Sequence, residues 1–351
     1  MIISRTPYRI SFFGGGTDYP AWYRVHGGAV LATTINKYCY ITCRYLPPFF
    51  EHRIRVMYSK VDRCQNIEEI SHPVVREVLR YLEIDRGIEI HHDGDLPARS
   101  GIGSSSSFTV GLLNALYALK GNLTNKQQLA KESIHIEQER LCETVGSQDQ
   151  VLAAYGGFTH IVFSPNGEIT VRPVTLSPDR VQELSSCLML LFTGINRTAS
   201  DVAGSYIQDI DKKQQALHEM CEMVEEGISI LNSGQPIAAF GKLLHRAWQA
   251  KRSLSSTVSN PHVEEIYSEA LAAGALGGKL LGAGGGGFML LFALPKDQPA
   301  IWRRLSRLLC VPFKFEYSGS QIIFFDPEDD YSALEKSRAD QAIAPFKELT
   351  S

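Results

Sequence analysis

The pattern of apolar and polar positions changes along the chain and predicts a mixture of strands and helices. Residues 29–45 are dense in β-branched and aromatic side chains, which favours a pair of strands. Residues 88–92 have the same character and run into a polar turn, so a further strand is expected there. Later in the chain, the apolar run at 187–192 and the segments on both sides of the glycines at 282–287 are also typical of strands.

Three helices are predicted after the polar turn near residue 97. The first begins in the serine run at 104–107, carries apolar residues at helical spacing and ends at Gly121. A Thr-x-x-Gln pair at 124–127 is typical of a capping box and predicts a second helix reaching about residue 141. A Ser-x-x-Gln pair at 147–150 predicts a third, short helix that ends at a glycine pair.

The second half of the chain is richer in long helices. Amphipathic helices are predicted at about 201–232, 236–256 and 261–273. A hairpin-like turn at 164–167 and a proline-bounded stretch at 173–178 precede them, so we expect two domains, at 1–178 and 179–345. Strands and helices in this mixed order predict an α+β fold.

Composition restricts the expected cellular compartment and binding partners but says little about the reaction. With 44% hydrophobic and 21% charged residues, the chain has ample material for a core, and its net charge of −3 gives no reason to expect nucleic acid or a membrane as partner. Its seven cysteines are scattered without a CxxC pair, and its N-terminus lacks the layout of a signal peptide. We therefore expect a cytoplasmic protein with a small-molecule substrate. The oligomeric state stays open, with a homodimer as one candidate.

The most informative segment is residues 97–107, PARSGIGSSSS. Its glycines let the backbone bend tightly and approach a ligand, and its serines lie where a helix begins. Free amides and the positive end of a helix dipole favour an anion at such a place, so the segment predicts a polyphosphate site. A serine hydroxyl there could complete a Mg²⁺ shell. The alternative is a helix cap with redundant serines, although one capping serine is enough for a helix.

Residues 282–287, GAGGGG, form a second glycine-rich loop. They satisfy the GxGxxG pattern, yet the next residues along the chain are typical of a strand, whereas a dinucleotide-binding fingerprint must open a helix. The sequence contains no GxxxxGK[ST] P-loop and no HRD or DFG motif of protein kinases. Taken alone, this loop also suits a glycine-rich hairpin with close backbone packing.

A third glycine-rich loop lies in residues 7–19, PYRISFFGGGTDY. A strand-like run ends in three glycines and is followed by Asp18, which places a carboxylate beside exposed backbone. Both could hydrogen bond to a hydroxylated ligand. A β-turn with an Asx cap is the alternative for this loop.

Together, the three loops resemble the three motifs of the GHMP kinases, the superfamily that includes galactokinase, homoserine kinase, mevalonate kinase and phosphomevalonate kinase. Their order and spacing match over about 280 residues. Within the superfamily, residues 99–107, 14–18 and 192–199 are similar to the D-glycero-D-manno-heptose 7-phosphate kinase branch. The resemblance implies the GHMP kinase two-domain fold, with an N-terminal domain like domain 2 of ribosomal protein S5 and a ferredoxin-like C-terminal domain.

The resemblance also implies ATP, Mg²⁺ and a set of catalytic residues. It makes Asp149 the group that orients and deprotonates the acceptor hydroxyl, and Arg9 the cation that holds Asp149 ionised. Asp149 lies in the first turn of its expected helix, where the dipole also favours a charged carboxylate. Ungapped spacing to Asp149 makes Glu137 the match for the metal-binding glutamate, together with Ser105, and Glu139 is a close runner-up. For Glu137 and Glu139, the alternative is a solvated helix face with charge pairs.

The remaining expected contacts lie in the motifs. The nucleotide is expected at Pro97, Gly101, Ile102, Gly103, Ser104, Ser105 and Ser106, and the sugar at Gly15, Gly16, Thr17, Asp18, Gly282, Ala283, Gly284, Gly285 and Arg197. Galactokinases carry Glu-His where this chain has Gly15-Gly16, so galactose specificity is not inferred. Arg197, Lys251 and Arg252 are candidates for holding a substrate phosphate, with surface charges as the alternative. Residues 57–70 are expected near adenine by analogy.

These implications predict a kinase that places a phosphate on the anomeric hydroxyl of a heptose 7-phosphate and yields the 1,7-bisphosphate. Three alternatives stay open. They are another sugar-1-kinase, acting on fucose or a uronic acid, a catalytically silent GHMP-fold sensor that binds sugar and ATP, and a GHMP-like decarboxylase.

Overall fold

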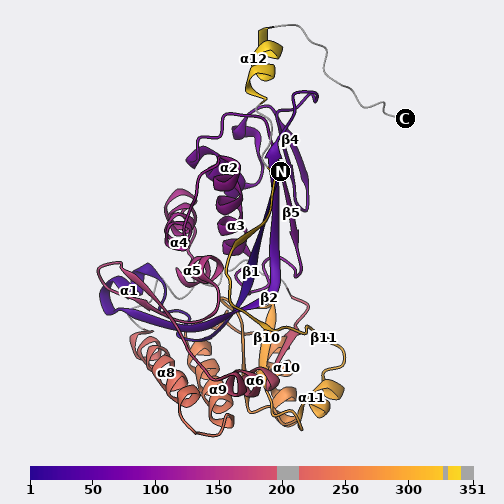
Figure 1. Ribbon diagram of the computed structural model, residues 1–351. Coiled ribbons are helices and arrows are strands. Elements are labelled where there is room, and N and C mark those ends of the chain that lie inside the picture. Colours follow the sequence, from indigo (N-terminus) through magenta and orange to yellow (C-terminus); the bar gives the residue numbers. More distant parts are fainter. Residues whose placement is uncertain (196–212, 327–330, 341–351) are drawn as a thin grey trace.

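A computed structural model describes residues 1–195, 213–326 and 331–340, which form two sheets with helices packed against them (Figure 1). The strands are β1 (Ile2–Phe13), β2 (Gly28–Tyr45), β3 (Ile54–Met57), β4 (Val61–Cys64), β5 (Ile88–Gly94), β6 (Phe158–Phe163), β7 (Ile169–Pro173), β8 (Leu188–Phe192), β9 (Gly277–Leu280), β10 (Phe288–Phe292), β11 (Leu309–Cys310), β12 (Phe315–Glu316) and β13 (Gln321–Phe325). The first sheet runs in the order β13-β1-β2-β5-β3-β4, with β12 and β6 pairing with β2 and β7 pairing with β6. The second sheet has the antiparallel order β11-β8-β10-β9.

The helices divide between the two sheets. They are α1 (Pro20–His26), α2 (Pro73–Tyr81), α3 (Ser104–Leu119), α4 (Lys126–His135), α5 (Gln148–Tyr155), α6 (Pro178–Ser186), α8 (Gln214–Asn232), α9 (Ala238–Arg252), α10 (Pro261–Ala272), α11 (Gln298–Arg304) and α12 (Ser332–Asp340), with a 3-10 turn η1 (Ile67–Glu69) and a π-helical turn η2 (Ile136–Arg140). Helices α2, α3, α4 and α5 lie together on one side of the first sheet, while α8 and α9 lie at its other end, beside the second sheet (Figure 1). This arrangement of two sheets with helices packed against them is the α+β fold that the sequence predicts.

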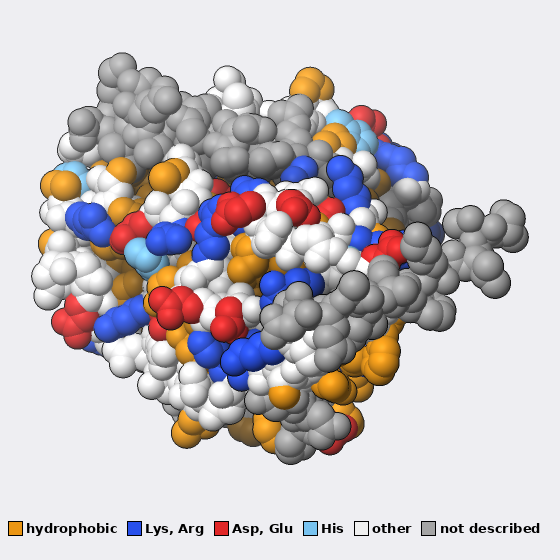
Figure 2. Space-filling view, turned by 90° about the horizontal axis from the view of Figure 1, so that it is seen from above, with side chains coloured by type: hydrophobic (Ala, Val, Ile, Leu, Met, Phe, Trp, Pro, Cys, Tyr) orange, Lys and Arg blue, Asp and Glu red, His pale blue; other side chains and the backbone are white. Residues whose placement is uncertain are grey.

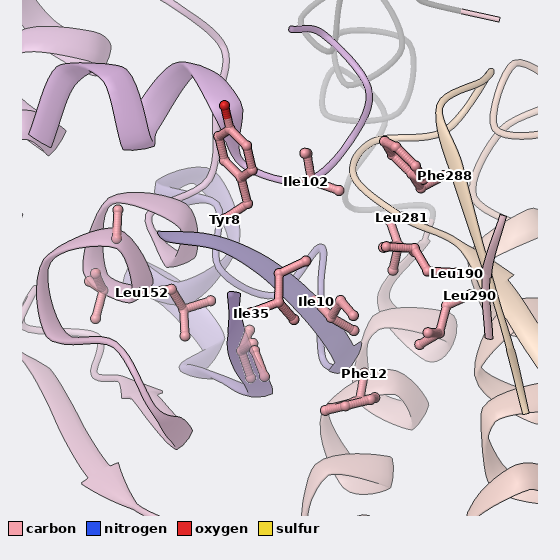
Figure 3. Close-up of a cluster of buried hydrophobic side chains, with 14 of the residues drawn as sticks. Tyr8, Ile10, Phe12, Ile35, Ile102, Leu152, Leu190, Leu281, Phe288 and Leu290 are labelled. Carbon is pink, nitrogen blue, oxygen red and sulfur yellow. The ribbon is translucent and has the colours of Figure 1, made fainter. Parts of the chain in front are cut away.

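A buried apolar layer joins the two sheets. Figure 3 shows its members, with Tyr8, Ile10, Phe12 and Ile35 from the first sheet and Leu190, Leu281, Phe288 and Leu290 from the second sheet and the loop beside it. Helix α9 adds Phe240, whose ring lies 5.4 Å from that of Phe12 in an edge-on contact. Because each of these side chains is almost fully removed from water, the layer fixes the glycine-rich loop in residues 7–19 relative to that at 282–287.

The end of the described chain returns to the first sheet. Strand β13 pairs antiparallel with β1 from Ile2–Phe325 to Arg5–Gln321, and β12 pairs with β2. Residues 315–325, which fall inside the range expected for the second domain, therefore extend the first sheet. The division of the chain after residue 178 stays a prediction.

Several local expectations are confirmed and others are wrong. The helix at the serine run and the hairpin of β6 and β7 form where the sequence predicts them. Residues 29–45 belong to one 18-residue strand rather than a strand pair, because β1, β5 and β6 all pair along β2. The cap of α4 is Asn125, which accepts from the amide of Gln128, instead of Thr124. Ser147 makes no side-chain cap bond to α5, so that capping box is wrong although the helix is present.

The long helices of the second half are shorter than expected where they can be compared. Helix α9 covers Ala238–Arg252 within the predicted range 236–256, and α10 covers Pro261–Ala272. Of the predicted helix at 201–232, α8 covers Gln214–Asn232, and residues 201–212 lie outside the described part of the chain.

Candidate active site

A cleft of about 860 Å³ is lined by residues of all three glycine-rich loops. From the residues expected in the site it contains Arg9, Gly15, Gly16, Asp18, Gly101, Gly103, Ser104, Ser105, Ser106, Glu137, Asp149, Gly282, Ala283 and Gly284. Thr17, Pro97, Ile102 and Gly285 do not line it, and Arg197 lies outside the described residues. Ile102 is buried in the core, and Thr17 closes the loop in residues 7–19 through hydrogen bonds to backbone carbonyls.

The mouth of α3 presents backbone donors to this cleft. Gly101 and Gly103 have φ angles of 81° and 75°, a left-handed conformation that glycine adopts without strain. The helix begins directly after Gly103, so the first-turn amides of residues 104–106 have no acceptor within the helix. An anion is favoured there by these amides and by the helix dipole.

The serines at this mouth are not redundant caps. Ser104 Oγ accepts a hydrogen bond from the Arg99 amide (3.2 Å), while Ser106 Oγ donates to a carboxylate oxygen of Glu137 (2.9 Å). Ser105 is exposed and lines the cleft. Each serine therefore has different surroundings, which the capping alternative does not explain.

Asp149 and Arg9 form a bidentate ion pair across the cleft wall. Arg9 Nε donates to Oδ1 of Asp149 (2.7 Å), and its Nη2 donates to Oδ2 (2.6 Å). The third guanidinium nitrogen, Nη1, donates to the carbonyl of Gly101 (2.5 Å), which ties the pair to the loop before α3. Such a fork-to-fork pair stabilises the ionised carboxylate. The structure thus brings together the two residues expected to act on the acceptor hydroxyl.

Glu137 lies in the π-helical turn η2 and is fully buried against α3. Its carboxylate accepts hydrogen bonds from Ser106, from Thr109 Oγ1 (2.7 Å) and from Gln150 Nε2 (2.5 Å). Burial raises the pKa of Glu137 to about 7 despite these donors. Glu139 is exposed, pairs with a histidine on its own helical turn and does not line the cleft. The geometry therefore favours Glu137 over Glu139 for any role in the cleft.

Asp18 is the buried carboxylate of the glycine-rich loop in residues 7–19. Its Oδ1 accepts from the Gly16 amide (2.9 Å), and its Oδ2 accepts from Gln148 Nε2 (3.0 Å). Burial raises the pKa of Asp18. A Cβ on Gly146 would lie 1.9 Å from Oδ2, so only glycine fits beside this carboxylate. The bond to Gly16 is the local turn contact that the alternative predicts, yet Asp18 also lines the cleft.

Two buried lysines, Lys251 and Lys279, also line the cleft. The sequence suggests Lys251 only as one candidate for holding a substrate phosphate, and it does not predict Lys279. Lys251 on α9 is 6% exposed, and its Nζ donates to the carbonyls of Leu280 (3.1 Å) and Gly282. Lys279 on β9 donates to the carbonyl of Phe12 (2.9 Å). Burial lowers the pKa of Lys251 to about 7 and that of Lys279 well below its usual range. The sequence feature that could have identified Lys279 is a single lysine inside the apolar run before residue 282.

Arg252, next in sequence to Lys251, has a different environment. Its side chain is partly exposed and forms an ion pair with Glu264 (3.0 Å), outside the cleft. This contact fits the surface-charge alternative for Arg252.

The glycines of the 282–287 loop are packed tightly against other backbone. A Cβ on Gly282 would lie 2.5 Å from Cα of Gly101, and one on Gly287 would lie 2.1 Å from the carbonyl oxygen of Ser100. A Cβ on Gly284 would lie 2.6 Å from the carbonyl oxygen of Val258. The close-packing alternative therefore describes these glycines correctly, although part of the loop also lines the cleft.

Three aromatic side chains, together named the aromatic arm, line the cleft near the start of α3. The ring of His72 stacks on Phe108 with 4.7 Å between centroids, and Tyr58 meets His72 edge-on at 5.0 Å. All three line the cleft. Burial lowers the pKa of His72 to about 4, so this ring is neutral at physiological pH. Only Tyr58 of the three falls in the range 57–70 expected near adenine.

The face of the molecule seen from above carries both signs of charge. Figure 2 shows lysine and arginine side chains interspersed with aspartate and glutamate there, and no large area of one sign is visible on the coloured part. An anionic ligand is therefore recognised by groups inside the cleft more than by the field of this surface.

Comparisons with known proteins support the family resemblance. The model of the GHMP kinases N terminal domain matches residues 70–157, and that of the GHMP kinases C terminal domain matches residues 229–309. A D-glycero-alpha-D-manno-heptose 7-phosphate kinase of Campylobacter jejuni is 28% identical over 311 residues, which cover 84% of this chain and 90% of that protein. An L-fucokinase/L-fucose-1-P guanylyltransferase of Bacteroides fragilis is 26% identical over 344 residues, covering 86% of this chain and 35% of that protein.

Solved structures share the fold over nearly the whole chain. The crystal structure of a D-glycero-D-manno-heptose 1-phosphate kinase from Bacteroides thetaiotaomicron has a TM-score of 0.75 at 24% identity, covering 92% of this chain and 99% of that one. Lactococcus lactis galactokinase complexed with galactose has a TM-score of 0.71 at 16% identity, covering 91% and 94%. Among the described residues, no helix combines the length and the apolar character that crossing a membrane requires.

Proposed function

Because this chain belongs to the GHMP kinases, ATP-dependent enzymes that phosphorylate an alcohol, we propose that it acts on the anomeric hydroxyl of D-glycero-D-manno-heptose 7-phosphate. The product would be the 1,7-bisphosphate, a precursor for nucleotide-activated heptose. The observation that carries the chemistry is the Asp149–Arg9 pair, which lies between the mouth of α3 and the glycine loops. The similarity to a heptose 7-phosphate kinase over most of both chains supports the substrate.

Different residues of the cleft have different roles in the reaction. The amides at the mouth of α3 bind the triphosphate of ATP, and the aromatic arm receives the adenine. Asp149 accepts the proton of the acceptor hydroxyl as the oxygen attacks the γ-phosphorus in line with the leaving ADP. Arg9 offsets the negative charge that builds up beside Asp149.

The chain also offers a magnesium site at the base of α3. Mg²⁺ prefers oxygen ligands, and the buried Glu137 carboxylate with the nearby hydroxyls of Ser105 and Ser106 supplies them. A carboxyl whose pKa is raised by burial fits a divalent cation, because the cation would hold it ionised. When bound there, Mg²⁺ would offset the charge of the transferred phosphates.

The acceptor end of the cleft suits a molecule rich in hydroxyl groups. Asp18 offers carboxylate oxygens to such groups. Ser11 Oγ and Gln148 Oε1 are buried, and neither has a hydrogen-bond partner among the described residues. Buried polar atoms without partners are costly, so a sugar that bonds to them would be stabilised.

A coupled ADP-release screen tests the proposal. The acceptors would be heptose 7-phosphate, the corresponding free heptose, fucose, galactose, uronic acids and mevalonate, each with ATP and Mg²⁺. We expect the highest kcat/KM with heptose 7-phosphate and loss of turnover with excess chelator. Turnover of a free sugar, with none of the heptose phosphate, would refute the proposed substrate and leave the kinase activity standing.

Another sugar-1-kinase is the second candidate, because the chain is 26% identical to the fucokinase protein over 344 residues. The same screen decides between them. A silent sugar and ATP sensor is disfavoured by the intact Asp149–Arg9 pair, since a sensor has no use for a base.

A further inference from the structure

Lys251 lies where the loop in residues 97–107 and the glycine-rich loop at 282–287 touch. It belongs to the last turn of α9, and its Nζ is held by the carbonyls of Leu280 and Gly282. Gly282 in turn packs so closely against Gly101 that a Cβ on Gly282 would lie only 2.5 Å from Cα of Gly101. Arg9 donates to the carbonyl of the same Gly101 (2.5 Å). Lys251 and Arg9 therefore flank one contact between the two loops.

The charge of Lys251 has no direct counterion in the free protein. Among the described residues, no carboxylate lies within ion-pair distance of its Nζ, and only carbonyls accept from it. Arg9, Asp18 and Asp149 are close enough to act on it electrostatically. A buried ammonium without a paired anion is costly, so burial lowers the pKa of Lys251 to about 7 in the free protein, and an anionic ligand bound beside it would stabilise the charged form.

An ammonium group has three N–H bonds, and two of those on Lys251 are used to fix its position. The remaining one is available to a ligand, because Lys251 lines the cleft. Held by two backbone carbonyls, the nitrogen cannot follow a moving ligand far. It is preorganised toward one place, between the loop that binds ATP and the acceptor side of Asp149.

We propose that Lys251 is a further catalytic residue, which donates a hydrogen bond to the phosphoryl group as it passes from ATP to the acceptor. In this step the bond from the γ-phosphorus to the ADP oxygen breaks as the bond to the acceptor oxygen forms. The acceptor proton goes to Asp149, and Lys251 gives up no proton. The proposal rests on the kinase activity and does not depend on which sugar is the acceptor.

Lys251→Met removes the ammonium while keeping an unbranched side chain, and Lys242→Met, on an exposed position of the same helix, is the matched control. We expect kcat to fall about 100-fold in Lys251→Met, as for loss of one preorganised donor, with KM for ATP and for the acceptor within about threefold. Lys251→Arg should recover part of kcat because it restores a charged donor. Lys242→Met should match the unmodified protein.

A second measurement separates catalysis from folding and from substrate recognition. ADP with aluminium fluoride mimics the phosphoryl group in transfer, and its affinity can be measured by calorimetry with and without acceptor. Lys251→Met should bind ADP normally and lose about 100-fold in affinity for the fluoride complex. Weakened binding of ADP itself would overturn the proposal by showing a structural role.

The phosphate of the acceptor is the other anion that could reach Lys251. A loss confined to KM for heptose 7-phosphate, with the free heptose unaffected, would overturn the proposal and assign Lys251 to that phosphate. If no sugar is turned over, the proposed substrate fails, and the binding of ADP with aluminium fluoride still decides the role of Lys251.

Discussion

The loop at the mouth of α3 and the loop between β9 and β10 are both rich in glycine and touch through Gly101 and Gly282, but Gly103 has different neighbours from the glycines of the second loop. A Cβ on Gly103 would lie 3.1 Å from the side chain of Arg9 and 3.4 Å from an oxygen of Asp149. Those on Gly282, Gly284 and Gly287 would lie 2.5, 2.6 and 2.1 Å from backbone atoms of other segments. Gly103 thus leaves room for the side chains of Arg9 and Asp149, whereas the glycines of the second loop let two pieces of backbone touch.

The difference shows that a run of glycines does not by itself identify a ligand loop. The segment directly after the glycines separates the two cases. Serines that begin a helix leave amides free for an anion, whereas an apolar strand continues the sheet. The charged groups divide in the same way, because the carboxylates Glu137 and Asp149 flank the first loop and the buried Lys251 and Lys279 flank the second.

The largest expected effect lies beside the first loop. Asp149→Asn keeps the shape of the side chain and removes the base, so kcat should fall about 1,000-fold while an ATP analogue binds with near-normal affinity. Steady-state ADP release and calorimetry measure the two quantities. Asp179→Asn, an exposed first-turn aspartate on α6, is the matched control. If Asp149→Asn kept its turnover, Asp149 would not be the base of the reaction.

The packing role of the second loop is tested by Gly282→Ala. Gly282 and Gly167 both have positive φ, 69° and 86°, but nothing lies within 4 Å of a Cβ on Gly167. Gly167→Ala should therefore lose only about 1 kcal/mol of unfolding free energy for the backbone conformation. Gly282→Ala should lose about 2 kcal/mol more because its Cβ meets the backbone of Gly101. Urea denaturation measures both, and equal losses would mean that the loops do not touch.

The buried lysine beside the second loop should make stability depend on pH. Burial lowers the pKa of Lys251 to about 7, so between pH 7 and about 10 the unfolded chain keeps a proton that the folded protein has released. Raising the pH therefore favours folding. Relative to Lys251→Met, the unfolding free energy of the unmodified protein should rise by about 1 kcal/mol per pH unit from pH 7 to 9. A constant difference across that range, as expected for the Lys242→Met control, would contradict a neutral buried lysine.

The smallest expected effect concerns the aromatic arm next to the first loop. Tyr58→Leu removes an aromatic edge from the His72 ring, so KM for ATP should rise about fivefold through lost aromatic packing. KM for the acceptor should not change. Tyr40→Leu, on β2 and away from the cleft, is the control. A change in acceptor KM alone would place the sugar in this arm instead of the adenine.

Local sequence was sufficient for the helix at residues 104–119 and for the free amides at its start, because helical periodicity and the glycine-serine run act over a few residues. Local sequence was not sufficient to identify the residue that caps each helix. Thr124 and Asn125 are both capping residues, and only the fold decides that Asn125 accepts from the amide of Gln128. The pairing of Arg9 with Asp149 spans 140 positions and was expected from the family resemblance, not from spacing.

Groups assembled from distant segments could not be predicted. Tyr58, His72 and Phe108 form one aromatic arm although they come from different elements and the loops between them. Lys279 faces the cleft from within an apolar strand, so no charge pattern marks it. Positions such as these depend on how the two sheets pack against each other.

The pairing of β13 with β1 has a consequence for protein synthesis. The partner of residues 2–5 is made only when the ribosome reaches residues 321–325, and the N-terminal ammonium then bonds to the carbonyl of Asp326 (2.7 Å). At about 5–20 residues per second, the edge of β1 lacks that partner for roughly 15–65 s of translation. A nascent chain with an open strand edge is a target for chaperones and for aggregation, so this enzyme should mature only after β13 emerges.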